Sequence, residues 1–246
     1  MLLNHETIEA FKDHVLKCYP EEACGIVQND VYIPMKNVSE DPLHQFEIDG
    51  SERFELEKIA PIQCILHSHP YKLADSKKFR EDHYHPVWAS VTDQESWMND
   101  NVPWGIVATD GEGISRFEWL EDEMKPFDKR EFSWFTADCY TCVRDWHRDH
   151  TKIIAPNFTR EFGFWLKGQN TIEEGIQTIP FATIHNVADA HIGDIAVFAI
   201  GQTVVNHLGV ISGQNQILHQ FVERYPEHAR WDVWSKRAKY LVRFNK

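Results

Sequence analysis

Residues 138–146 read Asp-Cys-Tyr-Thr-Cys-Val-Arg-Asp-Trp, an acidic residue followed at once by a cysteine and then by apolar residues at helical spacing. The pattern predicts a helix with Asp138 as its N-cap and Cys139 in its first turn. Unpaired backbone N–H groups and the positive end of the helix dipole favour a thiolate at that position. We therefore expect Cys139 to be a nucleophile, and Cys142, one turn later on much the same face, to be a core residue.

A cysteine nucleophile needs a base, and the sequence offers a histidine about seventy residues further on. His207 opens the apolar run 207–211, and His219 lies in the next predicted strand. Pairing across a hairpin would bring His219 beside His207, where it would orient the imidazole. A lone histidine in an apolar strand is more often structural, so His219 is a candidate only together with Cys139 and His207.

Composition limits the classes of function. The chain has 246 residues, a formal net charge of -13 and 42% hydrophobic residues, which fits one large or two small domains. The acidic balance argues against a nucleic-acid-binding surface, and the absence of a run of about eighteen apolar residues argues against a membrane span. The N-terminus lacks the basic and apolar regions of a signal peptide. The five cysteines show no paired spacing, so we expect reduced cytosolic thiols.

The pattern of helices and strands predicts an α+β protein of two domains, residues 1–122 and 130–246. The stretch between them is charged, contains Pro126 and has no hydrophobic periodicity. In the first domain we expect a helix near residues 8–18, a hairpin over 24–34 and strands at 62–66, 102–108 and 114–119. In the second we expect helices at 139–150 and 171–178, then a small antiparallel sheet formed by residues 194–200, 207–211 and 216–222.

A pair of histidines indicates a metal site in the first domain. His67 and His69 follow a short apolar strand and are separated by one residue, so both side chains point to one face. Two imidazoles in this arrangement are common zinc ligands. Asp93 is the expected third ligand, because Thr92 and Glu95 have the spacing of a capping box that would place it at a helix start.

Two further residues have the chemistry that such a site would use. Glu22 lies just before the first predicted strand and would take a proton from metal-bound water, whose pKa zinc lowers to about 7. Ser90 would help to hold an oxyanion. A His-x-His pair alone is as often incidental as functional, so the prediction depends on the whole set.

Glu22 before Cys24-Gly25, then His67-Ser68-His69-Pro70 and Ser90-x-x-Asp93, in that order, resemble the JAB/MPN (JAMM) metallopeptidase domain over roughly residues 1–120. The resemblance implies that Glu22 is the general base and that Ser90 assists. It also implies that zinc is the cofactor, bound by His67, His69 and Asp93.

One segment departs from the pattern of this family. The gap between the second histidine and Ser90 is more than twice the usual one, and the extra residues are 71–87. These residues are either a loop beside an intact site or a sign that the site has lost or altered its metal. Asp82 is a rival third ligand, although no Ser-x-x-Asp precedes it. His83 and His85 form a second His-x-His pair, which we expect to be solvated.

The second domain has a resemblance of its own. Asp138-Cys139 opening a helix, a Gly-Asp opening a strand, Asn206-His207 opening the next strand and His219 on a third resemble the NlpC/P60 cysteine peptidases over roughly residues 130–246. These papain-like enzymes cut peptide links in bacterial cell-wall stem peptides. The resemblance implies that Cys139 is the nucleophile, His207 the base and His219 the orienting group. Tyr-Thr follows Cys139 where many members have Ser-Gly, which does not affect the catalytic atoms.

A JAMM domain ahead of an NlpC/P60 domain resembles the tail assembly proteins of lambda-like siphophages. This order implies a tail-tip protein that is made in the host cytoplasm and carried by the virion to the bacterial periplasm. Its partners would be other tail-tip proteins and host peptidoglycan, with no nucleic acid. The alternative is a structural tail-tip scaffold or docking protein in which one or both sites are inactive. A deubiquitinase-like role is a weaker rival, because the second domain gives it no purpose.

Overall fold

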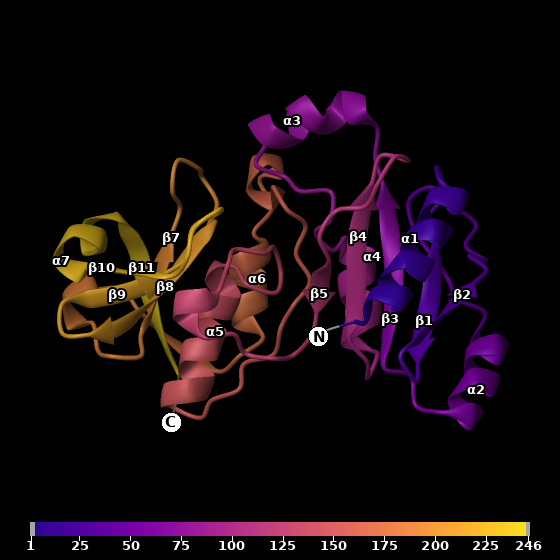
Figure 1. Cartoon of the computed structure of the whole chain (residues 1–246). Coiled ribbons are helices and arrows are strands. Elements are labelled where there is room, and N and C mark those ends of the chain that lie inside the picture. Colours follow the sequence, from indigo (N-terminus) through magenta and orange to yellow (C-terminus); the bar gives the residue numbers. More distant parts are fainter. Residues whose placement is uncertain (1–2, 245–246) are drawn as a thin grey trace. The chain divides into compact units, whose positions relative to one another are not determined.

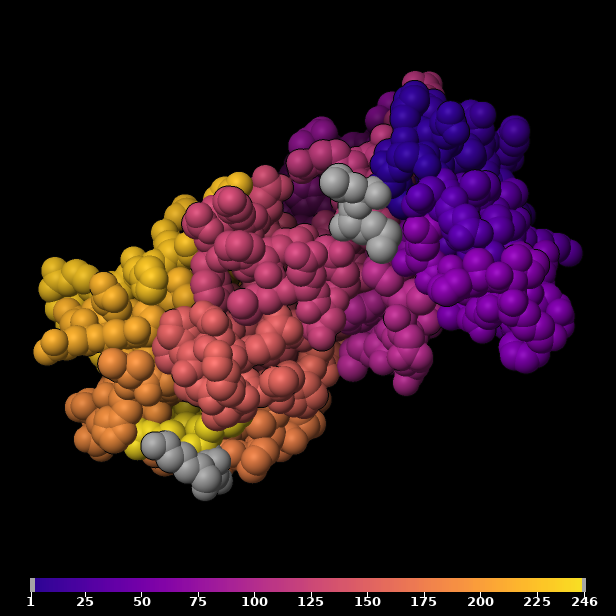
Figure 2. All heavy atoms as spheres, turned by 60° about the horizontal axis from the view of Figure 1, so that its bottom comes forward, coloured from indigo at the N-terminus to yellow at the C-terminus, as the bar shows by residue number. Residues whose placement is uncertain are grey.

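The structure is a computed structural model in which residues 3–244 are described, and it divides into two compact units. Unit 1 comprises Met1–Asp122 and unit 2 comprises Glu123–Lys246. Each unit combines helices with one small sheet, as the predicted α+β class requires (Figure 1). In the space-filling view, unit 1 is coloured indigo to magenta and unit 2 from pink to yellow (Figure 2).

Unit 1 is built on a five-stranded sheet of order β2-β1-β3-β4-β5. Only β3 and β4 are parallel to each other; the other neighbours are antiparallel. The elements in chain order are α1 His5–Cys18, β1 Cys24–Gln28, β2 Val31–Met35, α2 Gly50–Ile59, β3 Cys64–Pro70, α3 Ser76–Glu81, α4 Val91–Met98, β4 Trp104–Thr109 and β5 Glu118–Leu120.

The middle strand of this sheet, β3, carries the two histidines of the predicted metal site. Its first five residues are buried, because β1 and β4 flank it on both edges. His67 is paired in register with Cys24 on β1 and Ile106 on β4. The hairpin between β1 and β2 turns at Asn29 and Asp30, whose φ values of 48° and 60° are those of a two-residue hairpin turn.

Helix α1 covers unit 1 through an apolar stripe. Phe11 and Val15 are fully buried and pack in one cluster with Leu66 of β3 and Val107 of β4. The Phe11 ring also meets the Tyr32 ring edge-on, with centroids 5.2 Å apart. This cluster holds the helix on the sheet and fixes the plane from which β3 presents its histidines.

Unit 2 contains a six-stranded antiparallel sheet of order β10-β9-β8-β7-β11-β6. Helix α5 packs against β8 and β9. The elements in chain order are α5 Cys139–His150, α6 Thr171–Gln177, β6 Phe181–Ile184, β7 Ile195–Phe198, β8 His207–Gly213, β9 Gln216–His219, β10 Glu227–Arg230, α7 Trp231–Trp234 and β11 Ala238–Phe244.

Most predicted elements are confirmed, and the differences have local causes. The predicted strand 114–119 shrinks to β5, because Ile114 forms only an isolated bridge with Thr109. Helix α4 begins two residues earlier than a Thr92–Glu95 capping box requires: Ser90 is its N-cap, and the box is formed by Ser90 and Asp93. Helix α2 was not predicted, because none of its residues is buried and it has no apolar stripe.

Two findings bear on the remaining expectations from composition. The five cysteines are free thiols. Over residues 3–244, no helix has both the length and the apolar character needed to cross a membrane.

The packing of α1 yields a stability prediction. Phe11→Ala should lower the free energy of unfolding by about 3 to 5 kcal/mol, because it removes a fully buried ring and leaves a cavity. Urea unfolding followed by circular dichroism measures the loss, in the transition that belongs to unit 1. The control is Asp13→Ala, an exposed position on the same helix, which should change stability by less than about 0.5 kcal/mol. A loss no larger than that of the control would contradict the packing described.

Candidate functional site

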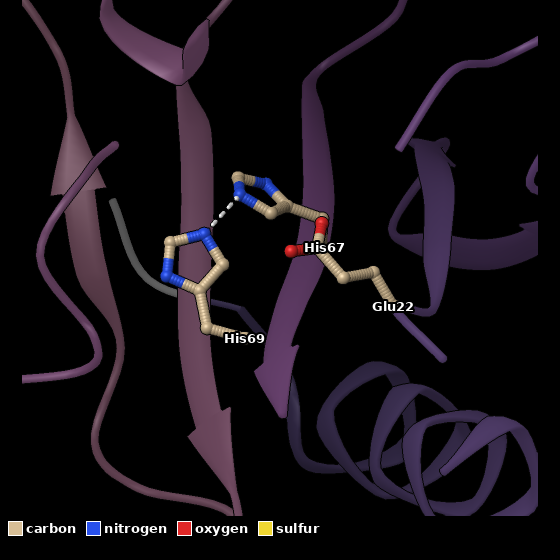
Figure 3. A group of neighbouring side chains, drawn as sticks. All are labelled: Glu22, His67 and His69. Carbon is tan, nitrogen blue, oxygen red and sulfur yellow. Dashed lines mark hydrogen bonds between the residues drawn. The ribbon is translucent and has the colours of Figure 1, made fainter. Parts of the chain in front are cut away.

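The two histidines of β3 lie with their ring nitrogens together. The Nε2 atoms of His67 and His69 are 3.1 Å apart, and both rings project from the same strand (Figure 3). The His67 side chain is fully buried and that of His69 is 13% exposed. Because side chains alternate along a strand, residues two apart share a face, as the sequence predicts.

Asp93 contacts both histidines, through a different carboxylate oxygen for each. Its Oδ1 lies 3.3 Å from His67 Nε2, and its Oδ2 lies 3.1 Å from His69 Nε2. In a tetrahedral zinc site with bonds near 2.0 to 2.1 Å, neighbouring ligand atoms are about 3.3 to 3.4 Å apart. Two imidazole nitrogens 3.1 Å apart, with a carboxylate beside both, are donors of the kind that a zinc ion takes.

Hydrogen bonds to the backbone hold two of these ligands in place. The Nδ1–H of His69 donates to the Pro86 carbonyl at 2.8 Å, which leaves Nε2 to face Asp93. The Ser90 N–H donates to Asp93 Oδ2 at 2.8 Å, and the Asp93 N–H donates to Ser90 Oγ at 3.1 Å. The Phe46 ring stacks on His67 with centroids 4.4 Å apart. Helix α4 thus presents Asp93 through its own cap.

The inserted segment 71–87 supports the cluster. Pro86, near its end, supplies the carbonyl that fixes His69. Asp82, the rival ligand, is exposed at the end of α3. His83 and His85 are exposed as well.

Glu22 stands beside the two histidines. Its carboxylate has an oxygen within 4.8 Å of a ring nitrogen of each (Figure 3). Glu22 is 4% exposed, and its Oε2 has no hydrogen-bond partner within the described chain. Burial raises the pKa of Glu22 to about 8; His69 opposes the rise, and Asp93 adds to it. A buried carboxylate with a raised pKa and an unpaired oxygen has the chemistry of a general base.

The charges within the cluster are strongly coupled. Burial alone would lower the pKa of His69, but Asp93 and Glu22 raise it to about 9. Burial likewise would raise the pKa of Asp93, and the two histidines hold it well below its usual range. The cluster therefore attracts a positive charge to the point where the two rings and Asp93 meet.

The second group of predicted residues gathers at the start of α5. Asp138 is the N-cap, as predicted, and its carboxylate accepts the Thr141 N–H at 3.0 Å. Arg160 donates to the same carboxylate at 2.7 Å, and both side chains are 1% exposed. The helix start, and with it Cys139, is anchored by a buried ion pair.

Cys139 and His207 line one pocket of about 200 Å³. His207 begins β8, and its Nε2 lies 3.1 Å from Nδ1 of His219 on β9. The Phe221 ring stacks on His207 at 4.3 Å with an interplanar angle of 4°. Opposite His219 in the sheet lies Gly209, where a Cβ would come within 3.1 Å of the His219 Cβ. The hairpin of β8 and β9 therefore aligns the imidazole pair, as the predicted pairing requires.

The surroundings of Cys139 and His207 shift the pKa of both groups. Burial raises the pKa of the Cys139 thiol to about 12, and the neighbouring Asp138 raises it further. Hydrogen bonds from the Leu208 and Tyr140 N–H groups oppose this without reversing it. Burial also holds the pKa of His207 well below its usual range. Desolvation, the largest influence on each group, favours the uncharged form of both, and the thiolate at Cys139 stays a prediction.

The sequence did not predict the burial of two arginines, Arg130 and Arg160. Arg130 pairs with Asp145, donates to Thr141 Oγ1 at 2.6 Å and is 1% exposed. Arg160 binds the cap of α5. No sequence signal marks either one, because Arg130 directly follows the charged stretch between the predicted domains and Arg160 lies in an aperiodic segment.

The predicted residues therefore form two clusters, one in each unit. Unit 1 brings together Glu22, His67, His69, Asp93 and Ser90, and unit 2 brings together Cys139, His207 and His219. Cys142 is fully buried, as expected of a core residue.

Comparison with known proteins points to bacteriophage tails. The tail tip assembly protein K of Escherichia phage lambda is 26% identical over 183 residues, which cover 74% of this chain and 81% of that protein. The protein of the same name from Escherichia phage N15 is 22% identical over 249 residues, which cover 98% and 96%. This chain is a homologue of tail tip assembly protein K.

The other two comparisons add little. No protein-family model matches the sequence. The solution structure of a protein from Desulfitobacterium hafniense covers 50% of this chain and 91% of its own, with 17% identity and a TM-score of 0.33.

The anchoring of α5 yields a second prediction. Asp138→Ala removes the N-cap and leaves Arg160 as a buried charge without its partner, so unit 2 should lose about 3 to 5 kcal/mol of stability. Denaturant unfolding measures the loss. Asp149→Ala, an exposed position near the end of the same helix, is the matched control. Equal stability of the two variants would refute the anchoring role.

Buried histidines make the stability of unit 2 dependent on pH. Burial lowers the pKa of both His147 and His219 to about 4. In the unfolded chain each titrates near 6.5, so the unfolded state binds protons first as the pH falls. Stability should therefore be full above about pH 6.5 and fall towards pH 4 by about 1.4 kcal/mol per pH unit for each histidine. Urea unfolding at a series of pH values tests this, and a flat profile over that range would contradict it.

Proposed function

We propose that this chain is a phage tail-tip protein whose unit 2 is a papain-like cysteine peptidase of the NlpC/P60 type. Its substrate is the stem peptide of host peptidoglycan. One observation carries the proposal: Cys139 at a helix start and His207, linked to His219, line a single pocket. The names of the two phage relatives support a place in tail assembly, with other tail proteins as partners and the virion tail as location.

The reaction is acyl transfer through Cys139. Because His207 Nε2 is engaged by His219 Nδ1, the free ring nitrogen for catalysis is Nδ1. It takes the proton of the thiol as Sγ attacks the peptide carbonyl and the C–S bond forms. The Cys139 N–H at the helix start faces the developing oxyanion. His207 then gives its proton to the leaving amine as the C–N bond breaks.

Water completes the cycle. His207 takes a proton from the water that attacks the thioester, and the thiol recovers a proton when the carboxylic acid leaves. In this proposal His207 takes the thiol proton as the sulfur attacks, because burial raises the pKa of Cys139. By resemblance to the family, the bond is the one between γ-D-glutamate and the diamino acid.

Unit 1, in the same proposal, is a zinc-peptidase-like domain of the JAB/MPN type that acts during tail assembly. His67, His69 and Asp93 would hold the zinc ion, which would supply a Lewis acid and a bound water of lowered pKa. Glu22 is placed to take a proton, and its burial keeps its pKa near that of such a water. Ser90 orients Asp93 and keeps its hydroxyl hydrogen free to donate to an oxyanion.

Cys139→Ala should abolish the release of soluble muropeptides from purified sacculi, because it removes the nucleophile. Chromatography of the soluble fraction measures the release. Cys142→Ala is the matched control, since this thiol lies in the same helix but is buried away from the pocket. Undiminished release by Cys139→Ala would sink the peptidase assignment and leave the scaffold alternative.

The metal site has its own test. Purified protein should contain stoichiometric zinc, and His67→Ala should lose it, because one of three ligands is gone. Elemental analysis after dialysis measures the content. His83→Ala, which alters an exposed histidine of the insertion, should keep its zinc. A protein that binds no zinc even when zinc is added would favour a docking role for unit 1.

A further inference from the structure

The two histidines of β3 are held in different ways. His69 donates from Nδ1 to the Pro86 carbonyl at 2.8 Å. His67 Nδ1 is buried and has no hydrogen-bond partner among residues 3–244. A histidine that binds a metal usually donates its second ring N–H to such a partner, which fixes the orientation of the ring. Some other contact must therefore hold the His67 ring.

Two aromatic rings supply that contact. The Phe46 ring stacks on the His67 ring, with centroids 4.4 Å apart and an interplanar angle of 29°. The Trp104 ring meets His67 edge-on, with centroids 5.8 Å apart. Phe46 and Trp104 also contact each other, at 5.2 Å. Because the face of Phe46 lies on the imidazole, it restricts rotation of that ring about its Cβ–Cγ bond.

The two rings belong to different parts of unit 1. Trp104 begins β4, is 5% exposed and donates from Nε1 to Asp100 Oδ2 at 3.3 Å. Phe46 is partly exposed and comes from residues 36–49, which connect β2 to α2. Phe46 can therefore be replaced without removing a side chain from a strand of the sheet.

Asn37 holds the chain on both sides of Phe46. Its Nδ2 donates to the Gln45 carbonyl at 3.1 Å, and its Oδ1 accepts the Glu47 N–H at 3.1 Å. The same Nδ2 donates to the Glu22 carbonyl, also at 3.1 Å. One side-chain amide thus links the two neighbours of Phe46 to the backbone of the candidate general base.

The stack favours the metal-bound form of His67. A zinc ion draws electron density from the imidazole that binds it, so the ring becomes more positive. The face of a phenyl ring carries partial negative charge and attracts a positive group that lies over it. The contact between Phe46 and His67 is therefore stronger with zinc than without it. Only a contact that differs between the two states changes the affinity.

We propose that Phe46 is a positioning residue for the zinc site of unit 1. Its ring takes the place of the hydrogen bond that His67 Nδ1 lacks, and it keeps His67 Nε2 turned towards His69 and Asp93. The inference rests on the proposed zinc-peptidase-like function of unit 1 and adds a residue to it.

The zinc affinity of the full chain tests the proposal, by competition with a chromophoric chelator. Phe46→Leu should bind zinc about 3- to 10-fold more weakly, because leucine fills much of the space but has no ring face. Phe46→Tyr keeps the ring and should stay within about twofold of the wild type. Equal affinities of Phe46→Leu and the wild type would overturn the inference, and so would equal losses in the two variants.

A matched control comes from the same segment. Leu43 is 46% exposed, and Leu43→Ala should leave the zinc affinity unchanged. Circular dichroism checks that each variant is folded. A loss in Leu43→Ala as large as that in Phe46→Leu would count against a specific role for the ring.

Nuclear magnetic resonance of the metal-free chain gives a readout that does not require zinc. The His67 ring protons lie over the Phe46 face, where the ring current shields them. Their signals, assigned by their loss in His67→Ala, should lie upfield in the wild type and in Phe46→Tyr. They should move downfield in Phe46→Leu. Unchanged His67 signals in Phe46→Leu would overturn the inference.

The two measurements separate this inference from the proposed function. If the wild type binds no zinc but the His67 signals respond as expected, the zinc-peptidase-like proposal fails and the positioning of His67 by Phe46 stands. If the wild type and Phe46→Leu bind zinc equally, the zinc site stands and the inference fails.

Discussion

The Asp138 carboxylate accepts hydrogen bonds from the Thr141 and Phe135 N–H groups and from Arg160, and the start of α5 depends on it. Because the helix begins at this buried ion pair, the ion pair fixes the position of Cys139 against the first residues of β8. The hairpin then places His219 behind His207. An interaction between two charges in the interior thus sets the geometry of a site made from three separate segments.

Unit 1 also has a carboxylate fixed at a helix start, but there the carboxylate itself contacts the histidines. Asp93 closes the capping box of α4 and, through the same carboxylate, reaches His67 and His69 on the central strand. In both units a carboxylate at a helix start is fixed by backbone N–H groups, and histidines come from a strand. Helix starts suit this role because their free N–H groups hold an anion without a flexible partner.

Burial decides how each site is charged. In unit 1 the opposite charges are close enough to outweigh desolvation, so the pKa of His69 rises and that of Asp93 falls. In unit 2 desolvation outweighs the other influences, so the pKa of Cys139 rises and that of His207 falls.

Local sequence determined much of this protein. Several features follow from neighbouring residues and were therefore predictable. They are the cap at Asp138, the helix that follows it, the Asn29–Asp30 turn and the common face of His67 and His69. Tertiary structure alone decided the burial of Arg130 and Arg160, the insertion of β11 between β7 and β6, and the desolvation that raises the pKa of Cys139. These depend on which distant segments exclude water from a group, and desolvation has no signature in local spacing.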